Sequence, residues 1–467
     1  MHMIEKNYSN ADFPAAAAKL PVMLALIIGG GTCSVLALIA PSLAEKLAVI
    51  IIMLAALIFI KANVPQLLLL ITIMPALFQI RIEQLGLVTF AVLIVSALFW
   101  IFAKTALGRG YFSHHRTLDI LIAINIFFAF NTLISAFYNS ALDQVAFMEI
   151  MRYLLYAGLI SISYNFISDI GSIYKIIWTA LAGSIAFSLA GYKIALSAGS
   201  HTFDLYGAAF LHASRIGLAN ANTIATVIAN PLPILISYFM YGSKKSYKFL
   251  YLGIFSFLFL VWIVWNSRAS YIYLFSAIFT LIMFNKNRWK YLSIIVAVAI
   301  LIIVLTLARA VPILTDFLRL EMGLSHREVL WSAGLRMIAE SPLLGKGPTF
   351  FDQNKYYYMD PNHGRLVSGT WTGISPHNVL IMRGVDMGIL AIIAQIFYWI
   401  VPLVFFVKNA KKMAGSAYYY LYLATGAIWI GIIFRSQFDT GASIFSMIML
   451  AAMFRLPQFI QKQTPHT

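Results

Sequence analysis

The chain is poor in charged residues and almost free of cysteine. Of its 467 residues only 11% are charged, whereas 61% are hydrophobic and the mean hydropathy is +0.84. Soluble domains carry about 25% charged residues, so this scarcity excludes an ordinary soluble protein. Cys33 is the only cysteine, which excludes an intrachain disulfide and a cysteine-based metal site.

The sequence consists largely of apolar runs of about 20 residues, the length of a membrane-spanning helix. These continuous runs favour an all-α polytopic membrane protein over a membrane β-barrel, whose strands alternate in short segments. We predict 12, or up to 14, spans, because one run is short and two others have almost no linker between them. The spans lie at about 22–40, 44–62, 65–79, 85–104, 118–139, 146–168, 173–192, 219–241, 249–266, 268–285, 290–308, 378–407, 417–434 and 437–456.

The net charge of +16 reflects membrane topology and does not indicate nucleic-acid binding. Four short linkers each carry a cluster of basic residues, which is typical of cytoplasmic loops. The clusters are Lys104, Arg109, Arg116; Lys244, Lys245, Lys248; Lys286, Arg288, Lys290; and Lys408, Lys411, Lys412. With a cytoplasmic N-terminus all four lie inside. The chain then divides into spans with short loops over 1–308, including an outside loop at 193–218, a large outside loop at 309–377, and further spans over 378–467.

The long outside loop has a helical part. Ser325-His326-Arg327-Glu328 matches a capping box at a helix start. Arg327 and Trp331 are four residues apart, which favours a cation–π contact that orients this helix. Ser341-Pro342 ends it, because proline disfavours helix in the preceding residue. Residues 352–376 are rich in Tyr, Gly and Pro, and we predict irregular structure there.

His377 and two arginines are the candidates for chemistry. His377 follows Pro376 at the end of the loop, where a neutral imidazole held in place serves as a general base. The alternative is a helix-cap residue at the membrane surface. Arg215 and Arg268 lie beside predicted spans, and a guanidinium fork suits phosphate oxygens. Their alternative roles are interfacial anchoring or a structural ion pair.

Two other pairs of charged residues are spaced three apart. Glu149 and Arg152, and likewise Arg383 and Asp386, would share one helix face. We predict structural ion pairs for both. The outside loops contain no Asp-x-Asp motif for a divalent metal, so the available groups favour metal-free transfer from a phosphate leaving group, with arginine charge and a histidine base.

Several short motifs occur in a specific order around a loop of this length. They are Arg215-Ile216-Gly217, Asn220-Ala221-Asn222, Ser267-Arg268-Ala269, Arg327 with Trp331, Glu340-Ser341-Pro342-Leu343-Leu344-Gly345-Lys346-Gly347, and His377-Asn378-Val379-Leu380. Together they resemble the O-antigen ligase and O-antigen polymerase superfamily of bacterial envelope glycosyltransferases. Asp386 departs from the pattern, which more often has Glu at this position.

The resemblance implies an integral-membrane glycosyltransferase of the all-helical, GT-C-like type that needs no cofactor. Its donor is a glycan on undecaprenyl diphosphate, transferred on the periplasmic face of the inner membrane with inversion. His377 would activate the acceptor hydroxyl, and Arg215 and Arg268 would hold the diphosphate. The expected supporting residues are Arg327, Trp331, Asn378, Asn222 and Arg152.

The acceptor separates the alternative functions. A ligase transfers the glycan to lipid A–core, and the single large outside loop favours this function. A polymerase uses a second undecaprenyl-linked repeat, and a third kind of relative glycosylates protein. A transporter of lipid or polysaccharide is the alternative from another class, but its polar groups would lie near the bilayer midplane in repeated halves. Membrane lipids are expected partners and nucleic acid is not.

Overall fold

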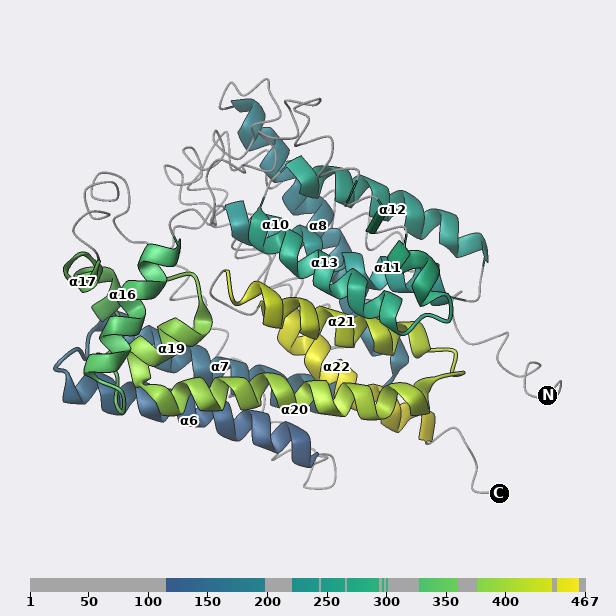
Figure 1. Cartoon of the computed structure of the whole chain (residues 1–467). Coiled ribbons are helices and arrows are strands. Elements are labelled where there is room, and N and C mark those ends of the chain that lie inside the picture. The colour runs from purple at the N-terminus through teal and green to yellow at the C-terminus, as the bar shows by residue number, and fades with distance from the viewer. Residues whose placement is uncertain are drawn as a thin grey trace, which may run out of the picture.

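The computed structural model is helical throughout the part of the chain that it describes. It describes residues 115–197, 221–242, 245–264, 267–293, 296–297, 300, 327–359, 376–438 and 443–461. Within these ranges every regular element is an α-helix (Figure 1), as the apolar runs predict. Arg215 and the first four predicted spans lie outside the described residues.

Three helices are long and apolar enough to cross a membrane: α6 (Arg116–Tyr138), α7 (Gln144–Phe166) and α20 (Ile389–Met413). The other helices that carry apolar stretches are α8 (Ile170–Ser197), α10 (Ala221–Ala229), α11 (Leu232–Tyr241), α12 (Lys245–Val264), α13 (Arg268–Met283), α21 (Tyr419–Arg435) and α22 (Ile444–Gln461). These helices lie at the predicted spans of the described part, two of which are divided as described below, so the chain is an integral membrane protein. The total of 12 or 14 spans stays a prediction.

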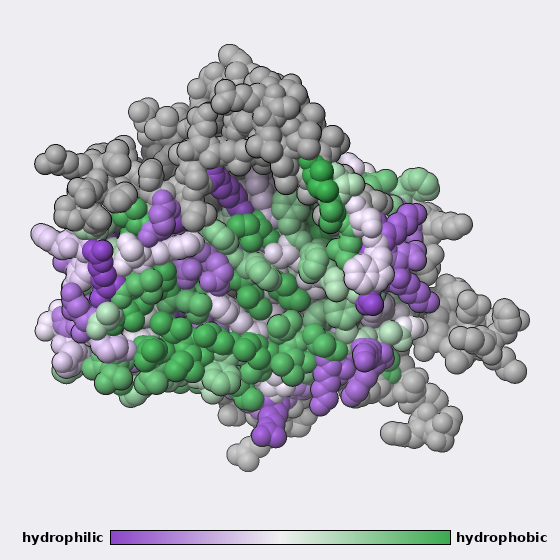
Figure 2. Space-filling view, in the orientation of Figure 1, coloured by the Kyte–Doolittle hydropathy of each residue, from purple (hydrophilic) through white to green (hydrophobic). Residues whose placement is uncertain are grey.

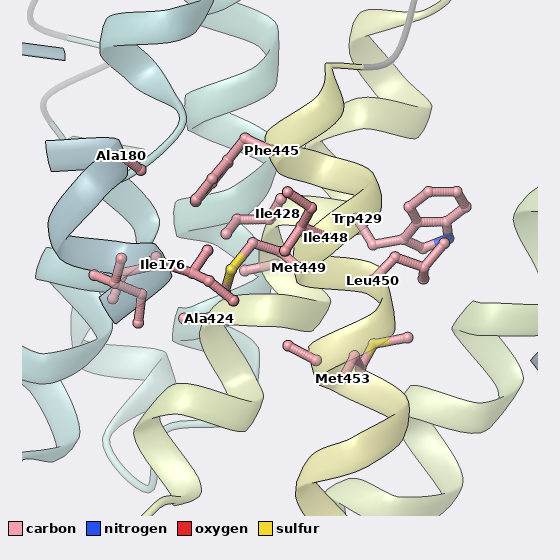
Figure 3. Packing of buried hydrophobic residues seen from close by; sticks show 14 of the residues in the cluster. Ile176, Ala180, Ala424, Ile428, Trp429, Phe445, Ile448, Met449, Leu450 and Met453 are labelled. Carbon is pink, nitrogen blue, oxygen red and sulfur yellow. The ribbon is translucent and has the colours of Figure 1, made fainter. Parts of the chain in front are cut away.

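The C-terminal helices form the centre of the described bundle. Helix α22 packs against α7 and α21, and α21 packs against α13 and α11. Figure 3 shows this core, in which Ile176 and Ala180 of α8 lie near Ala424 and Ile428 of α21, with Met449 of α22 among them. The side chains of α22 from Met447 to Phe454 are almost completely buried. A helix that is apolar all round belongs inside a bundle, and α22 occupies that place.

Helix α20 has one face inside the bundle and one face outside it. Its outward side chains are apolar and more than a third exposed, and they recur at helical spacing: Ile389, Ile393, Ile396, Ile400, Val404 and Val407. Figure 2 shows a continuous hydrophobic area over this helix. An apolar surface of this extent is typical of a face in contact with lipid.

The predicted span at 378–407 is interrupted, and the sequence prediction of one continuous helix was wrong. The short helix α19 (Val379–Met387) precedes α20, with Gly388 between them at φ +82° and ψ −174°. This conformation is open essentially to glycine alone. A Cβ on Gly388 would also lie 2.2 Å from the carbonyl oxygen of Leu343. A turn of the loop therefore occupies the space beside the break.

The carbonyl groups freed by this break find partners on α6 and on the loop. Ser135 Oγ donates to the Asp386 oxygen at 2.6 Å, and Asn131 Nδ2 donates to the Met387 oxygen at 3.1 Å. The backbone N–H of Lys346 donates to the Val385 oxygen at 2.6 Å. Helix ends leave unsatisfied carbonyls that must be paired when buried, and these contacts pair them. They also fix the loop on the bundle.

The loop itself contains two helices around a small core. Helix α16 (Arg327–Glu340) confirms the predicted helix and ends directly before Ser341-Pro342. Helix α17 (Phe350–Tyr358) was not predicted, since irregular structure was expected from residue 352. Its Phe351 packs with Leu330 and Met337 of α16 and Val385 of α19. This tertiary contact accompanies helix formation at α17, and the local Tyr-rich composition did not indicate it.

Two further boundaries differ from the sequence prediction. The span at 219–241 is divided into α10 and α11 at Asn230 and Pro231, because proline lacks the N–H that a continuous helix needs. The capping residues Ser325 and His326 lie outside the described residues, so the capping box stays a prediction.

Candidate functional site

His377 lies in a backbone conformation that is uncommon for residues other than glycine. Its φ is +49°, in the left-handed region that few non-glycine residues adopt. The next residue, Asn378, is the N-cap of α19, and its Oδ1 accepts hydrogen bonds from the N–H groups of Leu380 and Ile381 at 3.0 and 3.2 Å. Strained residues of this kind cluster at functional sites and persist only where their surroundings enforce them.

The surroundings of His377 enforce its position from both sides. The indole N–H of Trp331 on α16 donates to the Pro376 oxygen at 2.9 Å. The backbone N–H of Val379 donates to the oxygen of Ser436, which follows α21, at 2.9 Å. The two end residues of the Pro376–Val379 segment are thus bound to two other elements. We define this meeting of α16, α19 and the end of α21 as the His377 junction.

An aromatic contact joins the loop helix to the end of α21. The ring of Phe438 lies 5.9 Å from the Arg327 guanidinium carbon and 6.3 Å from the Trp331 ring, which it meets edge to face. The sequence predicted a cation–π contact between Arg327 and Trp331. In the structure the ring beside the Arg327 guanidinium is that of Phe438. Both Arg327 and Trp331 of the loop helix therefore contact Phe438, which lies far away in the sequence.

The imidazole of His377 is partly buried, with its Nδ1 inside the protein. Asp352, in the first turn of α17, lies within electrostatic reach of it. Burial raises the pKa of the Asp352 carboxyl, while Lys355 and His377 act in the opposite direction. Lys355 is itself buried and lies 3.9 Å from Asp352. The sequence analysis missed these two residues, although their spacing of three on a helix was a usable signal.

Arg268 begins α13 at the same end of the bundle as the His377 junction. It is partly buried, and Ser267 before it caps the helix by accepting from the Ser270 N–H. Further along α13, Tyr273 packs against Gly431 of α21, so closely that a Cβ on this glycine would meet the ring at 2.7 Å. Gly431 lies little more than one turn before Ser436 of the junction. A helix N-terminus carries partial positive charge that adds to that of the arginine, which suits an anion.

Asn222 belongs to α10, which packs on α13 and α8.

Within the described ranges no group of three or more His, Cys, Asp or Glu side chains is placed to hold a metal ion.

A cavity of about 70 Å³ lies between α6, α7, α19, α20, α21 and α22. Val379 and Ser436 of the His377 junction form part of its wall. Glu149 and Arg152 of α7 also line it and form the predicted ion pair, at 2.6 Å. Arg383 of α19 lines it as well. We name this space the α19 cavity.

The predicted ion pair between Arg383 and Asp386 is not formed. The Arg383 guanidinium carbon instead lies 4.5 Å from the ring centroid of Tyr153 and 5.0 Å from that of Phe128. Its Nε donates to Gln395 Oε1 at 3.4 Å. The side chain therefore turns toward α6, α7 and α20, although the sequence spacing permitted a pair along α19.

The family comparison covers the same region. Residues 253–396 match the family model described as O-antigen ligase. The matched segment includes Arg268, the loop helices, His377 and Arg383. No curated protein matches the chain. Members of this family are membrane glycosyltransferase-like enzymes. The match confirms, for residues 253–396, the resemblance to the O-antigen ligase and polymerase superfamily seen in the motifs, and it does not distinguish ligase from polymerase.

Proposed function

We propose that this protein is an O-antigen ligase of the bacterial inner membrane. It transfers a glycan from undecaprenyl diphosphate to a sugar hydroxyl of lipid A–core on the periplasmic face. The observation that carries the proposal is the His377 junction, since it holds a histidine in a strained conformation at the edge of the bundle. A base must be fixed within reach of the proton it removes, and three elements fix this one.

The proposed reaction is a single displacement. The acceptor oxygen attacks the anomeric carbon, and its proton passes to a ring nitrogen of His377. The bond between the anomeric carbon and the diphosphate oxygen breaks, and its electron pair leaves with undecaprenyl diphosphate. The configuration at the anomeric carbon is inverted. His377 then releases the proton to water.

Arginine charge would take the place that a metal ion has in other transferases. Arg215 and Arg268 are proposed to bind the donor diphosphate and to stabilise the negative charge that grows on it. The guanidinium fork makes two hydrogen bonds to one phosphate group. The start of α13 contributes further positive charge near Arg268. Asn222 and Arg152 are proposed as supporting residues, the latter through its pair with Glu149.

A polymerase of the same superfamily would use the same donor chemistry. Acceptor choice is proposed to depend on residues 352–376. Tyr356 and Tyr358, at the start of this stretch, belong to α17, which is joined to α16 by the hydrogen bond from Arg336 to the Tyr358 oxygen, 3.0 Å.

The deciding experiment is deletion of the gene followed by gel analysis of lipopolysaccharide. Loss of the ligase leaves bare core and accumulated lipid-linked polymer. Core that carries one repeat indicates a polymerase, and unchanged lipopolysaccharide contradicts both functions. Purified protein supplied with donor and acceptor should remain active in the presence of chelator. Activity that disappears with chelator and returns with a divalent ion would overturn the arginine-based mechanism.

A further inference from the structure

The α19 cavity contains an arginine that the mechanism above does not use. Among the residues that the structure describes, Arg383 makes no ion pair, and Gln395 is its hydrogen-bond partner. Two aromatic rings hold the guanidinium, at 4.5 and 5.0 Å. Such contacts fix the plane of the group and leave its terminal nitrogens available to a ligand. An arginine held in this way is prepared for an anion.

The charge around the cavity also favours an anion. Its lining carries Arg152 and Arg383 against Glu149. Glu149 is already paired with Arg152 at 2.6 Å, so that pair is close to neutral and the positive charge of Arg383 remains. Asp386, the other acidic residue near Arg383 on α19, does not line the cavity. Glu149 and Asp386 act on the Arg383 charge from a distance, but neither forms an ion pair with it among the described residues. A bound anion would supply a direct partner for the buried guanidinium.

The size and walls of the cavity indicate the kind of anion. Its volume of about 70 Å³ is several times the roughly 10–15 Å³ that one water needs. The remaining walls are mainly aromatic and apolar, with Phe128, Tyr156 and Trp399 among them. A small anionic headgroup attached to an apolar chain matches this combination. A prenyl diphosphate has that chemistry.

The cavity is also close to the base. Val379, two residues after His377, and Ser436, whose oxygen accepts from the Val379 N–H, line the cavity together with Arg383. The arginine and the histidine therefore belong to neighbouring parts of the same region.

From these observations we infer that Arg383 is a phosphate-binding residue for the prenyl diphosphate donor, in the cavity beneath α19. The inference rests on the proposed function and adds a residue that the motifs of the family resemblance did not include. Arg383 would stabilise the negative charge on the leaving diphosphate as the anomeric bond breaks. Gln395 is its positioning residue, since it holds the guanidinium from α20.

Binding of farnesyl diphosphate by the purified full-length protein tests the inference without turnover. Arg383→Met should weaken binding by about tenfold to a hundredfold, as expected for the loss of hydrogen bonds to a charged group. Arg383→Lys should recover only part of the affinity, because a point charge lacks the fork. Arg288→Met, at an exposed position in the linker after α13, is the matched control and should bind as the wild type does. Binding by Arg383→Met within twofold of the wild type, at unchanged melting temperature, would overturn the inference.

Competition experiments identify the source of the phosphate. Farnesyl diphosphate should compete with the lipid-linked donor, and this competition should be lost in Arg383→Met. Competition with the acceptor alone would contradict the donor site and place an acceptor phosphate there. His377→Ala should bind the probe normally. If the wild type binds the probe through Arg383 but transfers no glycan, the phosphate site is retained and the proposed function is rejected. If the wild type transfers glycan but binds the probe equally well without Arg383, the proposed function is retained and the phosphate site is rejected.

Discussion

Helices α6 and α19 both begin after a histidine, and they differ in almost every other respect. His115 precedes α6 in ordinary extended conformation, with φ −134°, and the helix continues for 23 residues. His377 precedes α19 with φ +49°, and this helix ends after nine residues at Gly388. Helix α6 is a regular span with exposed apolar side chains. Helix α19 is a broken segment whose backbone groups bind α6, α21 and the loop.

The difference shows how a polar site is built within an apolar bundle. Irregular backbone is tolerated at membrane depth only where protein or water satisfies it. At the end of α19, hydrogen bonds from Ser135, Asn131 and the backbone N–H of Lys346 pair the free carbonyl oxygens. The break brings a strained histidine and an arginine-lined cavity to one place. Continuous spans such as α6 contact lipid and need no such partners.

The largest expected effect separates the two histidines. His377→Ala should reduce transfer by about 100-fold to 10,000-fold, the usual contribution of a general base, and should leave donor binding intact. His115→Ala, at the start of α6, should retain activity close to that of the wild type. Both are measured with purified protein, labelled donor and acceptor. Near-normal turnover of His377→Ala would remove His377 as the base.

The second prediction concerns the break itself. Gly388→Ala should destabilise the protein by about 2–6 kcal/mol, because alanine is strained in this conformation and its Cβ would meet the Leu343 oxygen. Gly415→Ala is the matched control: its φ is +89°, and a Cβ there has open space. It should cost only about 1 kcal/mol. Thermal unfolding in detergent measures both. Equal losses would show that the close approach to the loop is unimportant.

The third prediction compares two helix caps. Asn378 caps α19 with two hydrogen bonds, and Asp143 caps α7 by accepting from the Ala146 N–H at 2.8 Å. Alanine at either position should cost about 0.5–2 kcal/mol. Only Asn378→Ala should also lower the turnover number, since it loosens the segment that holds His377. A comparable loss of turnover in Asp143→Ala would mean that the effect is one of general stability.

The smallest expected effect is a pH dependence at the start of α6. Burial lowers the pKa of His115 below its usual 6.5. The unfolded chain therefore binds a proton at this position more readily than the folded protein, so the contribution of His115 to stability is present above pH 6.5 and is lost as the pH falls through the folded pKa. The melting temperature of the wild type should fall over this range by more than that of His115→Phe. Parallel curves would contradict the burial of His115 as the cause.

The sequence predicted the helical class, most described spans, the loop helix α16 and the pair of Glu149 and Arg152. Each follows from local signals: apolar runs of membrane length, a proline after Glu340, and a spacing of three on one helix face. It did not predict α17 or the division of 378–407. Both depend on contacts between segments far apart in the chain, such as Phe351 with Leu330 and the turn at Leu343 with Gly388.

The sequence by itself determined that the chain spans a membrane, and its motifs singled out His377 and the arginines. Those results depend on composition and short spacing, which act within one or two helical turns. Only the tertiary structure decided that His377 is strained, that Trp331 and Ser436 hold its neighbours, and that Arg383 turns away from Asp386 into a cavity. The physical reason is that each of these contacts pairs groups from different helices, and such groups have no preference for one another until packing brings them together.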